Sequence, residues 1–87
     1  MTLLNVGFDN AVAVQRIVAV VGADTSPIKR LRDAALRSRK LIDATNGRRT
    51  RTVIITDSDH VVLSSLQPET LGQRWAELLS TSPRNAS

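Results

Sequence analysis

The residues best suited to chemistry in this sequence are three arginines within four positions, Arg48, Arg49 and Arg51. A guanidinium group keeps its charge at any ordinary pH, and its forked donors match the paired oxygens of a phosphate. The cluster follows an Asn-Gly pair, which is a strong turn signal, and precedes a β-branched run typical of a strand. We therefore expect a basic turn, held up by a strand, that binds a polyanion. A merely solvated basic turn is the competing interpretation.

A fourth arginine, Arg16, interrupts the apolar run at 11–21. A charged group within an apolar strand must face either solvent or a partner, because leaving it buried and unpaired is costly. Two interpretations stay open. Arg16 either lies on an exposed face with its stem packed along the strand, or it points to the same partner as the basic turn.

Asp57, Asp59 and His60 are the side chains that could hold a metal or act in catalysis. Alternation along an extended chain puts the two aspartates on one side and the imidazole on the other, and ordinary turn chemistry explains both aspartates. The chain has one histidine, no cysteine, and neither a GxGxxG nor a Walker pattern. We expect no metal site, no cofactor and no catalytic residue, so we do not expect an enzyme.

These residues must be positioned by helices and strands, and the apolar pattern of the sequence predicts an α+β fold. We expect a small antiparallel β-sheet with two helices, in the order β-β-α-β-β-β-α. The predicted strands span about 2–8, 11–21, 41–43, 52–56 and 60–66, and the predicted helices span 27–39 and 68–80. The last two strands form a hairpin that puts Val53, Ile55, Val61 and Leu63 on one face.

Both predicted helices begin at a proline, which fits the first helical turn because its missing N–H has no partner there. Ser26 is the expected N-cap of the first helix, with a buried stripe formed by Ile28, Leu31 and Ala35, joined by Ala34 and Leu36. Trp75 is expected in the core stripe of the second helix.

The length of 87 residues predicts one domain at 1–80 and a disordered tail at 81–87. The apolar residues are mostly Val, Ile, Leu and Ala, which make a thin core that gains stability by assembly with other subunits. The sequence shows neither a signal peptide nor a membrane-spanning run. We expect a cytoplasmic homo-oligomer.

The formal net charge is +4, and ten of the twelve cationic residues are arginine. This bias favours nucleic acid over a membrane surface as the partner. There is no tyrosine, and neither Phe8 nor Trp75 is expected beside the arginines, so stacking platforms for single strands are lacking. Double-stranded DNA, held by its phosphates, is the expected partner.

Several segments together resemble the bacterial RemA family of extracellular-matrix gene regulators, in the family's order and spacing over about 1–75. These segments are Asn5-Val6-Gly7-Phe8, Ser26-Pro27-Ile28-Lys29-Arg30, Leu41-Ile42-Asp43-Ala44-Thr45, Gly47-Arg48-Arg49-Thr50-Arg51, Asp57-Ser58-Asp59-His60-Val61 and Gln67-Pro68-Glu69-Thr70.

The resemblance implies a DNA-binding transcriptional regulator whose subunits form a closed ring, with arginines on the exterior that grip and bend the duplex. Arg48 and Arg49 match the family's DNA-contacting pair, Arg16 matches a further arginine linked to binding, and Pro27 matches a proline that supports assembly. We expect Arg51 to contact phosphate as well. An RNA-binding protein and a module that uses its basic surface on an acidic protein are the alternatives.

Overall fold

The computed structural model of the chain describes residues 2–80, so the predicted tail at 81–87 lies outside the described residues. The elements in order are β1 (Leu3–Gly7), β2 (Asn10–Ala13), a single 3-10 turn η1 (Val14–Arg16), β3 (Ile17–Gly22), α1 (Ser26–Arg37), β4 (Leu41–Asp43), β5 (Thr52–Thr56), β6 (Val61–Ser64) and α2 (Pro68–Ser80). The α+β class with two helices is confirmed.

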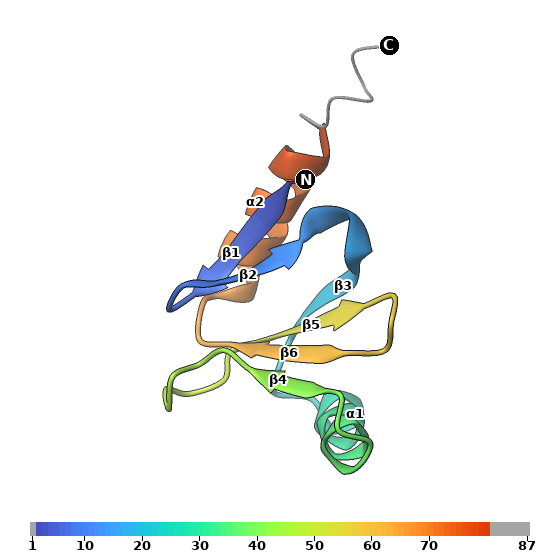
Figure 1. Ribbon diagram of the computed structural model, residues 1–87. Coiled ribbons are helices and arrows are strands. Elements are labelled where there is room, and N and C mark those ends of the chain that lie inside the picture. The colour runs from blue at the N-terminus through green and yellow to red at the C-terminus, as the bar shows by residue number, and fades with distance from the viewer. Residues whose placement is uncertain (1, 81–87) are drawn as a thin grey trace.

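The strands form two sheets, and the expectation of one antiparallel sheet is wrong (Figure 1). β1 and β2 make a separate antiparallel hairpin that lies along α2. The larger sheet has the strand order β3, β5, β6, β4, and α1 contacts it at β4. The pair β4 and β6 is parallel, with Leu41 opposite Val61. Local strand signals gave the elements, but the pairing of β4 depends on tertiary contacts.

The run at 11–21, expected as one strand, is broken at η1 and serves both sheets. Val14 is buried at the break, and its carbonyl accepts a 3.1 Å hydrogen bond from Nε1 of Trp75. Gln15 and Arg16 are exposed. In a continuous strand, successive side chains point to opposite faces, so Gln15 and Arg16 could not both be exposed next to a buried Val14. The strand therefore breaks at these two polar residues.

Two apolar clusters fill the two faces of the larger sheet. Ile54 belongs to the cluster shared with β1 and α2, which Trp75 partly covers as predicted. Val53 and Ile55 belong to the cluster on the α1 side, together with Val61 and Leu63, so the predicted hairpin face is confirmed. The alternation along β5 follows from the pleat of a strand.

The first helix differs from its prediction at both ends and on its stripe. It begins at Ser26 rather than after it, with Thr25 as an N-cap that makes no side-chain hydrogen bond. It ends at Arg37, because Arg39 adopts a left-handed φ of 62° and the Lys40 N–H bonds to the Ala35 carbonyl at 2.8 Å. Ala35 is buried, but Leu31 and Leu36 are exposed, contrary to the predicted stripe. The bounds predicted for α2 are confirmed.

No helix within residues 2–80 combines the length and the apolar composition that crossing a bilayer requires.

Candidate nucleic-acid interface

The loop that carries the arginines starts from a polar anchor at the end of β4. Asp43 Oδ1 accepts hydrogen bonds from the Thr45 hydroxyl at 2.6 Å and from the Thr45 N–H at 2.9 Å. These bonds, the hydroxyl first, lower the pKa of the Asp43 carboxyl from its ordinary value. The Arg48 N–H then bonds to the Thr45 carbonyl at 3.0 Å across the predicted Asn-Gly turn. The anchor thus fixes where the arginines begin.

The turn itself has a defined geometry. Asn46 and Gly47 have φ of 53° and 80°, so both central residues are left-handed, as in a type I′ turn. Asparagine and glycine are the residues that tolerate this conformation. The strong turn signal in the sequence is therefore confirmed, although the turn lies in a loop and not in a hairpin.

The loop ends on a rigid backbone at Arg51. Its N–H bonds to the Ser64 carbonyl at 2.9 Å, and its own carbonyl accepts the Ala23 N–H at 3.1 Å. The backbone of Arg51 is therefore fixed between the ends of β6 and β3. Its side chain remains exposed, which leaves the guanidinium available to an incoming ligand.

The structure brings Arg48, Arg49 and Arg51 together around one hollow of about 360 Å³, which Phe8 and Ser65 also line. We call these five residues the basic hollow. The guanidinium carbon of Arg48 lies 5.8 Å from the centre of the Phe8 ring, within the range of a cation–π contact. Three guanidinium groups, which can only donate, and the Ser65 hydroxyl, which can also donate, make the hollow rich in donors, which suits an anion with several oxygens.

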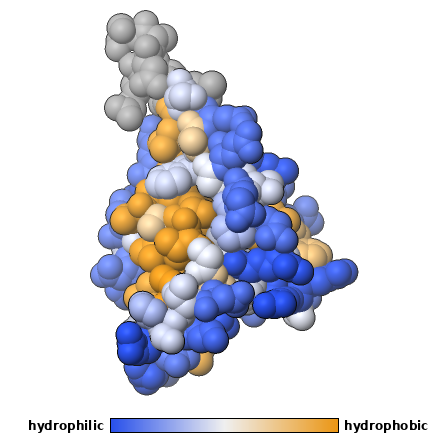
Figure 2. All heavy atoms as spheres, turned by 180° about the vertical axis from the view of Figure 1, so that it is seen from behind, coloured by the Kyte–Doolittle hydropathy of each residue, from blue (hydrophilic) through white to orange (hydrophobic). Residues whose placement is uncertain are grey.

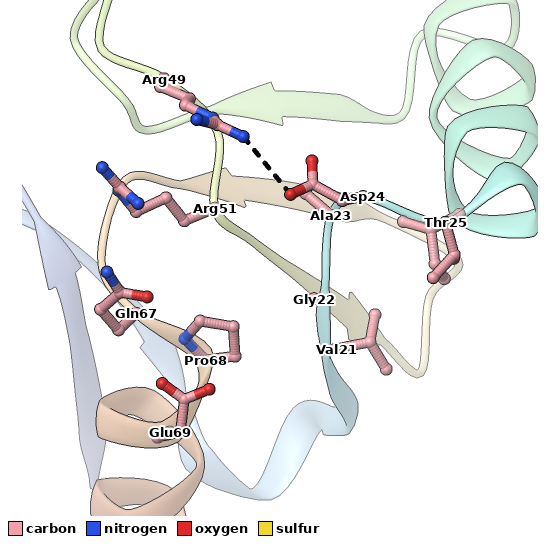
Figure 3. A pocket seen from close by; sticks show the side chains of 11 residues that line it. Val21, Gly22, Ala23, Asp24, Thr25, Arg49, Arg51, Gln67, Pro68 and Glu69 are labelled. Atoms are coloured by element: carbon pink, nitrogen blue, oxygen red, sulfur yellow. Dashed lines mark hydrogen bonds and ion pairs between the residues drawn. The ribbon is translucent and has the colours of Figure 1, made fainter.

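Arg49 and Arg51 also border a second hollow of about 480 Å³, between the loop before α1 and the start of α2 (Figure 3). The Arg49 guanidinium reaches Asp24 Oδ2 at 3.5 Å, with the two side chains 68% and 75% exposed. Figure 3 shows the Arg51 side chain extending away from this pair. An ion pair so exposed is weak, so Asp24 competes with an external anion without excluding it.

Arg16 lies elsewhere on the protomer, so the structure does not bring all four predicted arginines together. Its Nε donates to Asp57 Oδ1 at 2.9 Å, and the Asp57 N–H bonds to the Arg16 carbonyl at 2.8 Å. Asp57 follows β5 whereas Arg51 precedes it. The six residue steps between them extend roughly 20 Å along a strand. Arg16 itself sits in η1 rather than in a strand, with its side chain 63% exposed.

Pro27 occupies the first turn of α1 and is exposed. It is absent from the residues that line the basic hollow. It is the second residue of α1 and not the first as predicted, but it still lies in the first turn, where its missing N–H has no partner to lose.

Two of the three residues that could have formed a metal or catalytic site, Asp57 and His60, contact other side chains. Ser58 Oγ lies 2.7 Å from Nδ1 of His60, and Ser58 also bonds to the Thr56 hydroxyl at 3.0 Å. Asp57 pairs with Arg16. Over residues 2–80, no three His, Cys, Asp or Glu side chains are grouped so that they could hold a metal ion.

Phe8 is the site residue that the sequence interpretation missed, and the expectation that no aromatic lies beside the arginines is wrong. The β1–β2 hairpin docks on the end of β6 through a 2.7 Å bond from Ser64 Oγ to the Val6 carbonyl. The Leu66 side chain lies beside Gly7, so close that a Cβ added to the glycine would be 3.7 Å from it. These docking contacts join residues almost 60 positions apart in the sequence and bring Phe8 beside Arg48, about 40 positions away, and nothing local signals this.

The fold and this loop define a small α+β protein whose exposed arginines suit an anionic partner. Its residues 3–75 match the sequence model of the RemA-like family, described as extracellular matrix regulatory protein A-like. The chain belongs to the RemA-like family.

Curated relatives agree with this assignment. A protein of Oceanobacillus iheyensis is 58% identical over 74 residues, which cover 85% of this chain and 86% of the relative. A protein of Thermodesulfovibrio yellowstonii is 57% identical over 76 residues, covering 87% and 89%. One from Thermotoga maritima is 55% identical over 75 residues, covering 86% and 82%. Each of the three is named a "putative regulatory protein".

Proposed function

We propose that this chain is a cytoplasmic DNA-binding transcriptional regulator that assembles into a ring and grips and bends duplex DNA through arginine contacts. The observation that carries the proposal is the basic hollow, where three exposed arginine side chains project from a loop. Its backbone is hydrogen-bonded to Thr45 at one end and to Ser64 and Ala23 at the other. The family description and the names of the relatives support a regulatory role rather than an enzymatic one.

Arginine–phosphate contacts hold a duplex in position without reading its sequence. Sequence preference then comes from the ease with which the DNA bends, and from an arginine that reaches into a narrow minor groove. Arg48, Arg49 and Arg51 supply the phosphate contacts at one end of β5. Arg16 lies roughly 20 Å from Arg51 along β5, which corresponds to about six phosphates along one DNA strand. Arg16 therefore meets the same duplex as a separate contact.

Assembly is supported by the edge of the larger sheet. Within residues 2–80, β3 pairs with β5 on one side and has no strand on its other side. Its sequence Ile-Val-Ala-Val-Val-Gly contains no charged residue and no proline, the features that usually keep an edge strand from pairing. Val18 on this strand is 61% exposed. We propose that a second copy of the chain covers this edge.

The surface supports the same proposal. Figure 2 shows apolar side chains gathered in one area of the molecule seen from behind, bordered by hydrophilic ones. Contiguous apolar area of this kind marks association surfaces. Pro27 contributes to assembly in this proposal by fixing the start of α1.

The test is the double variant Arg48→Ala/Arg49→Ala, compared with Arg37→Ala/Arg39→Ala, which removes the same charge from the end of α1. Anisotropy of a labelled duplex at several salt concentrations gives affinity and salt slope. We expect at least about a tenfold loss and a shallower slope for the first variant, since each lost phosphate contact reduces the slope by about 0.9. Circular dichroism should show both variants folded. Wild-type affinity in the first variant would overturn the proposal.

One observation favours a second candidate, an RNA-binding protein. Phe8 is 46% exposed beside Arg48, and an aromatic ring next to arginine can stack an unpaired base. Competition between a duplex DNA and a folded RNA of equal length, at matched ionic strength, separates the two candidates. Stronger displacement by the RNA would favour this second candidate.

A further inference from the structure

The turn that carries Phe8 is strained. Phe8 and Asp9 have φ of 50° and 65°, so both adopt the left-handed region between β1 and β2. Glycine, asparagine and aspartate accept this region readily, but a bulky aromatic residue does so at a cost. Such strain persists where the surroundings hold it in place, and it gathers at functional sites.

Side chains on both sides of the turn hold it. The Asn10 amide donates to the Gly7 carbonyl at 3.1 Å and to the Phe8 carbonyl at 3.0 Å, and Asn5 Oδ1 accepts the Gly7 N–H at 2.8 Å. The hairpin is in turn tied to β6 through the Val6 carbonyl. The backbone at Phe8 is therefore held in the left-handed conformation by its neighbours, which sets the direction in which the side chain leaves the backbone.

The ring placed in this way lies against Arg48. The guanidinium carbon lies over the Phe8 ring, 5.8 Å from its centre, and a cation–π contact does not use up the N–H donors, which can still bond to a ligand. Ser65 and the other two arginines complete the lining of the basic hollow. A guanidinium already restricted by a ring loses less rotamer freedom when it binds an anion.

We propose that Phe8 is a positioning residue of the basic hollow, whose ring holds the Arg48 guanidinium so that the hollow takes one phosphate group of a nucleic-acid backbone. The inference rests on the proposed function and adds the reason for a strained aromatic in the β1–β2 turn. Phe8 acts through Arg48 and forms no bond to the phosphate itself.

The first test is a double-mutant cycle on duplex binding with Phe8→Leu and Arg48→Ala. An exposed cation–π contact corresponds to about two- to fivefold in affinity per site, and copies that act together on one duplex multiply the loss. We expect Phe8→Leu to weaken binding in the wild-type background and to have no effect beside Arg48→Ala. Phe8→Tyr, which keeps the ring, should bind like the wild type. An equal loss in both backgrounds would show that Phe8 contacts DNA directly and would overturn the inference.

The second test separates positioning from folding. Phe8→Asn replaces the ring by a residue that accepts a positive φ. We expect its Tm to be equal to or higher than that of the wild type, while its affinity for duplex DNA falls as in Phe8→Leu. A lower Tm with unchanged affinity would assign Phe8 a structural role and overturn the inference.

The outcomes for the two proposals differ. If the wild-type protein does not bind duplex DNA in dilute buffer, the proposed function fails, and the inference fails with it. If the wild type binds and Phe8→Leu binds equally well, the inference alone fails.

Discussion

Arg49 differs from the other two arginines of the basic hollow because a carboxylate already contacts it. Asp24 lies 3.5 Å from the Arg49 guanidinium, and both side chains are largely exposed. A phosphate that binds Arg49 must compete with this contact and with the negative potential of Asp24. The pair is exposed, so its effect should be small and should decline as salt rises.

We predict that Asp24→Asn binds duplex DNA about two- to fivefold more tightly than the wild type at low salt, since an exposed pair contributes about 0.5–1 kcal/mol. Anisotropy titrations at low and high salt measure this difference, which should shrink in high salt. Asp33→Asn, at an exposed residue of α1, is the matched control, because it changes net charge equally at a residue that lines neither of the two hollows beside the arginines. Equal gains in both variants would assign the effect to net charge alone.

At the same scale, the sequence identified the arginines of the basic hollow but missed Phe8. Arg48, Arg49 and Arg51 are close in the chain, so their proximity in space needs nothing beyond a turn. Phe8 joins them through hairpin docking over a long sequence separation, set by a buried hydroxyl and a glycine contact. Arg16 shows the converse, because the break at η1 places it near Asp57 at the far end of β5.

At the scale of elements, the link between β4 and the basic loop depends on Asp43. The Thr45 side chain that it holds is buried, with 2% of the residue exposed. Removal of the carboxylate leaves the Thr45 hydroxyl and N–H without this acceptor, which costs about 1–3 kcal/mol for a buried donor. Asp43→Ala should therefore lower the free energy of unfolding by about 1–2 kcal/mol, as measured by urea denaturation. Asp43→Asn keeps an acceptor oxygen and should lose less.

The same contact predicts a pH dependence. The Thr45 hydroxyl, followed by its N–H, makes the pKa of Asp43 lower in the folded state than in the unfolded state. Between the two pKa values the unfolded chain therefore binds more protons than the folded chain. The contribution of Asp43 to the free energy of unfolding is complete above the unfolded pKa and is lost as pH falls through the folded pKa. Between about pH 5 and about pH 3, the urea midpoint should fall more in the wild type than in Asp43→Asn. Parallel pH profiles would contradict this role for Asp43.

The elements themselves were mostly predictable. The hairpin of β5 and β6 and the helix α2 follow from alternation, turn residues and a helix-starting proline, which act over a few residues. The two-sheet arrangement, the parallel pairing of β4 and the end of α1 at a left-handed arginine depend on packing between distant segments. The local sequence pattern cannot specify such contacts, because the same strand could form its backbone hydrogen bonds with any of several other strands.

At the scale of the whole molecule, the basic hollow and the β3 edge of the larger sheet are formed by different residues. The basic hollow is lined by residues of the β1–β2 turn, of the loop before β5 and of the end of β6. None of these five residues belongs to β3, although the Arg51 carbonyl accepts the Ala23 N–H just after that strand. Copies that associate through β3 would therefore keep the basic hollow open. Many weak phosphate contacts on one assembly add to a strong grip, since each further contact is made at high effective concentration.

This arrangement predicts that Val18→Glu separates the copies without unfolding the protomer. Val18 is 61% exposed in the single chain, so the substitution costs little there, whereas a carboxylate buried between two copies would be unpaired. Light scattering should give the mass of one chain for the variant and a multiple of it for the wild type. Affinity for a long duplex should fall on the order of a hundredfold, with circular dichroism unchanged.

Gln73→Glu, at an exposed residue of α2, is the control, because it makes the same change of net charge outside the β3 strand. It should keep both the mass and most of the affinity of the wild type. A Val18→Glu protein with the wild-type mass would place the association surface elsewhere on the molecule. A wild-type protein that remains a single chain would contradict assembly itself. Its affinity for DNA should then stop rising once the duplex is long enough to contact one protomer, because no second copy is present to add contacts.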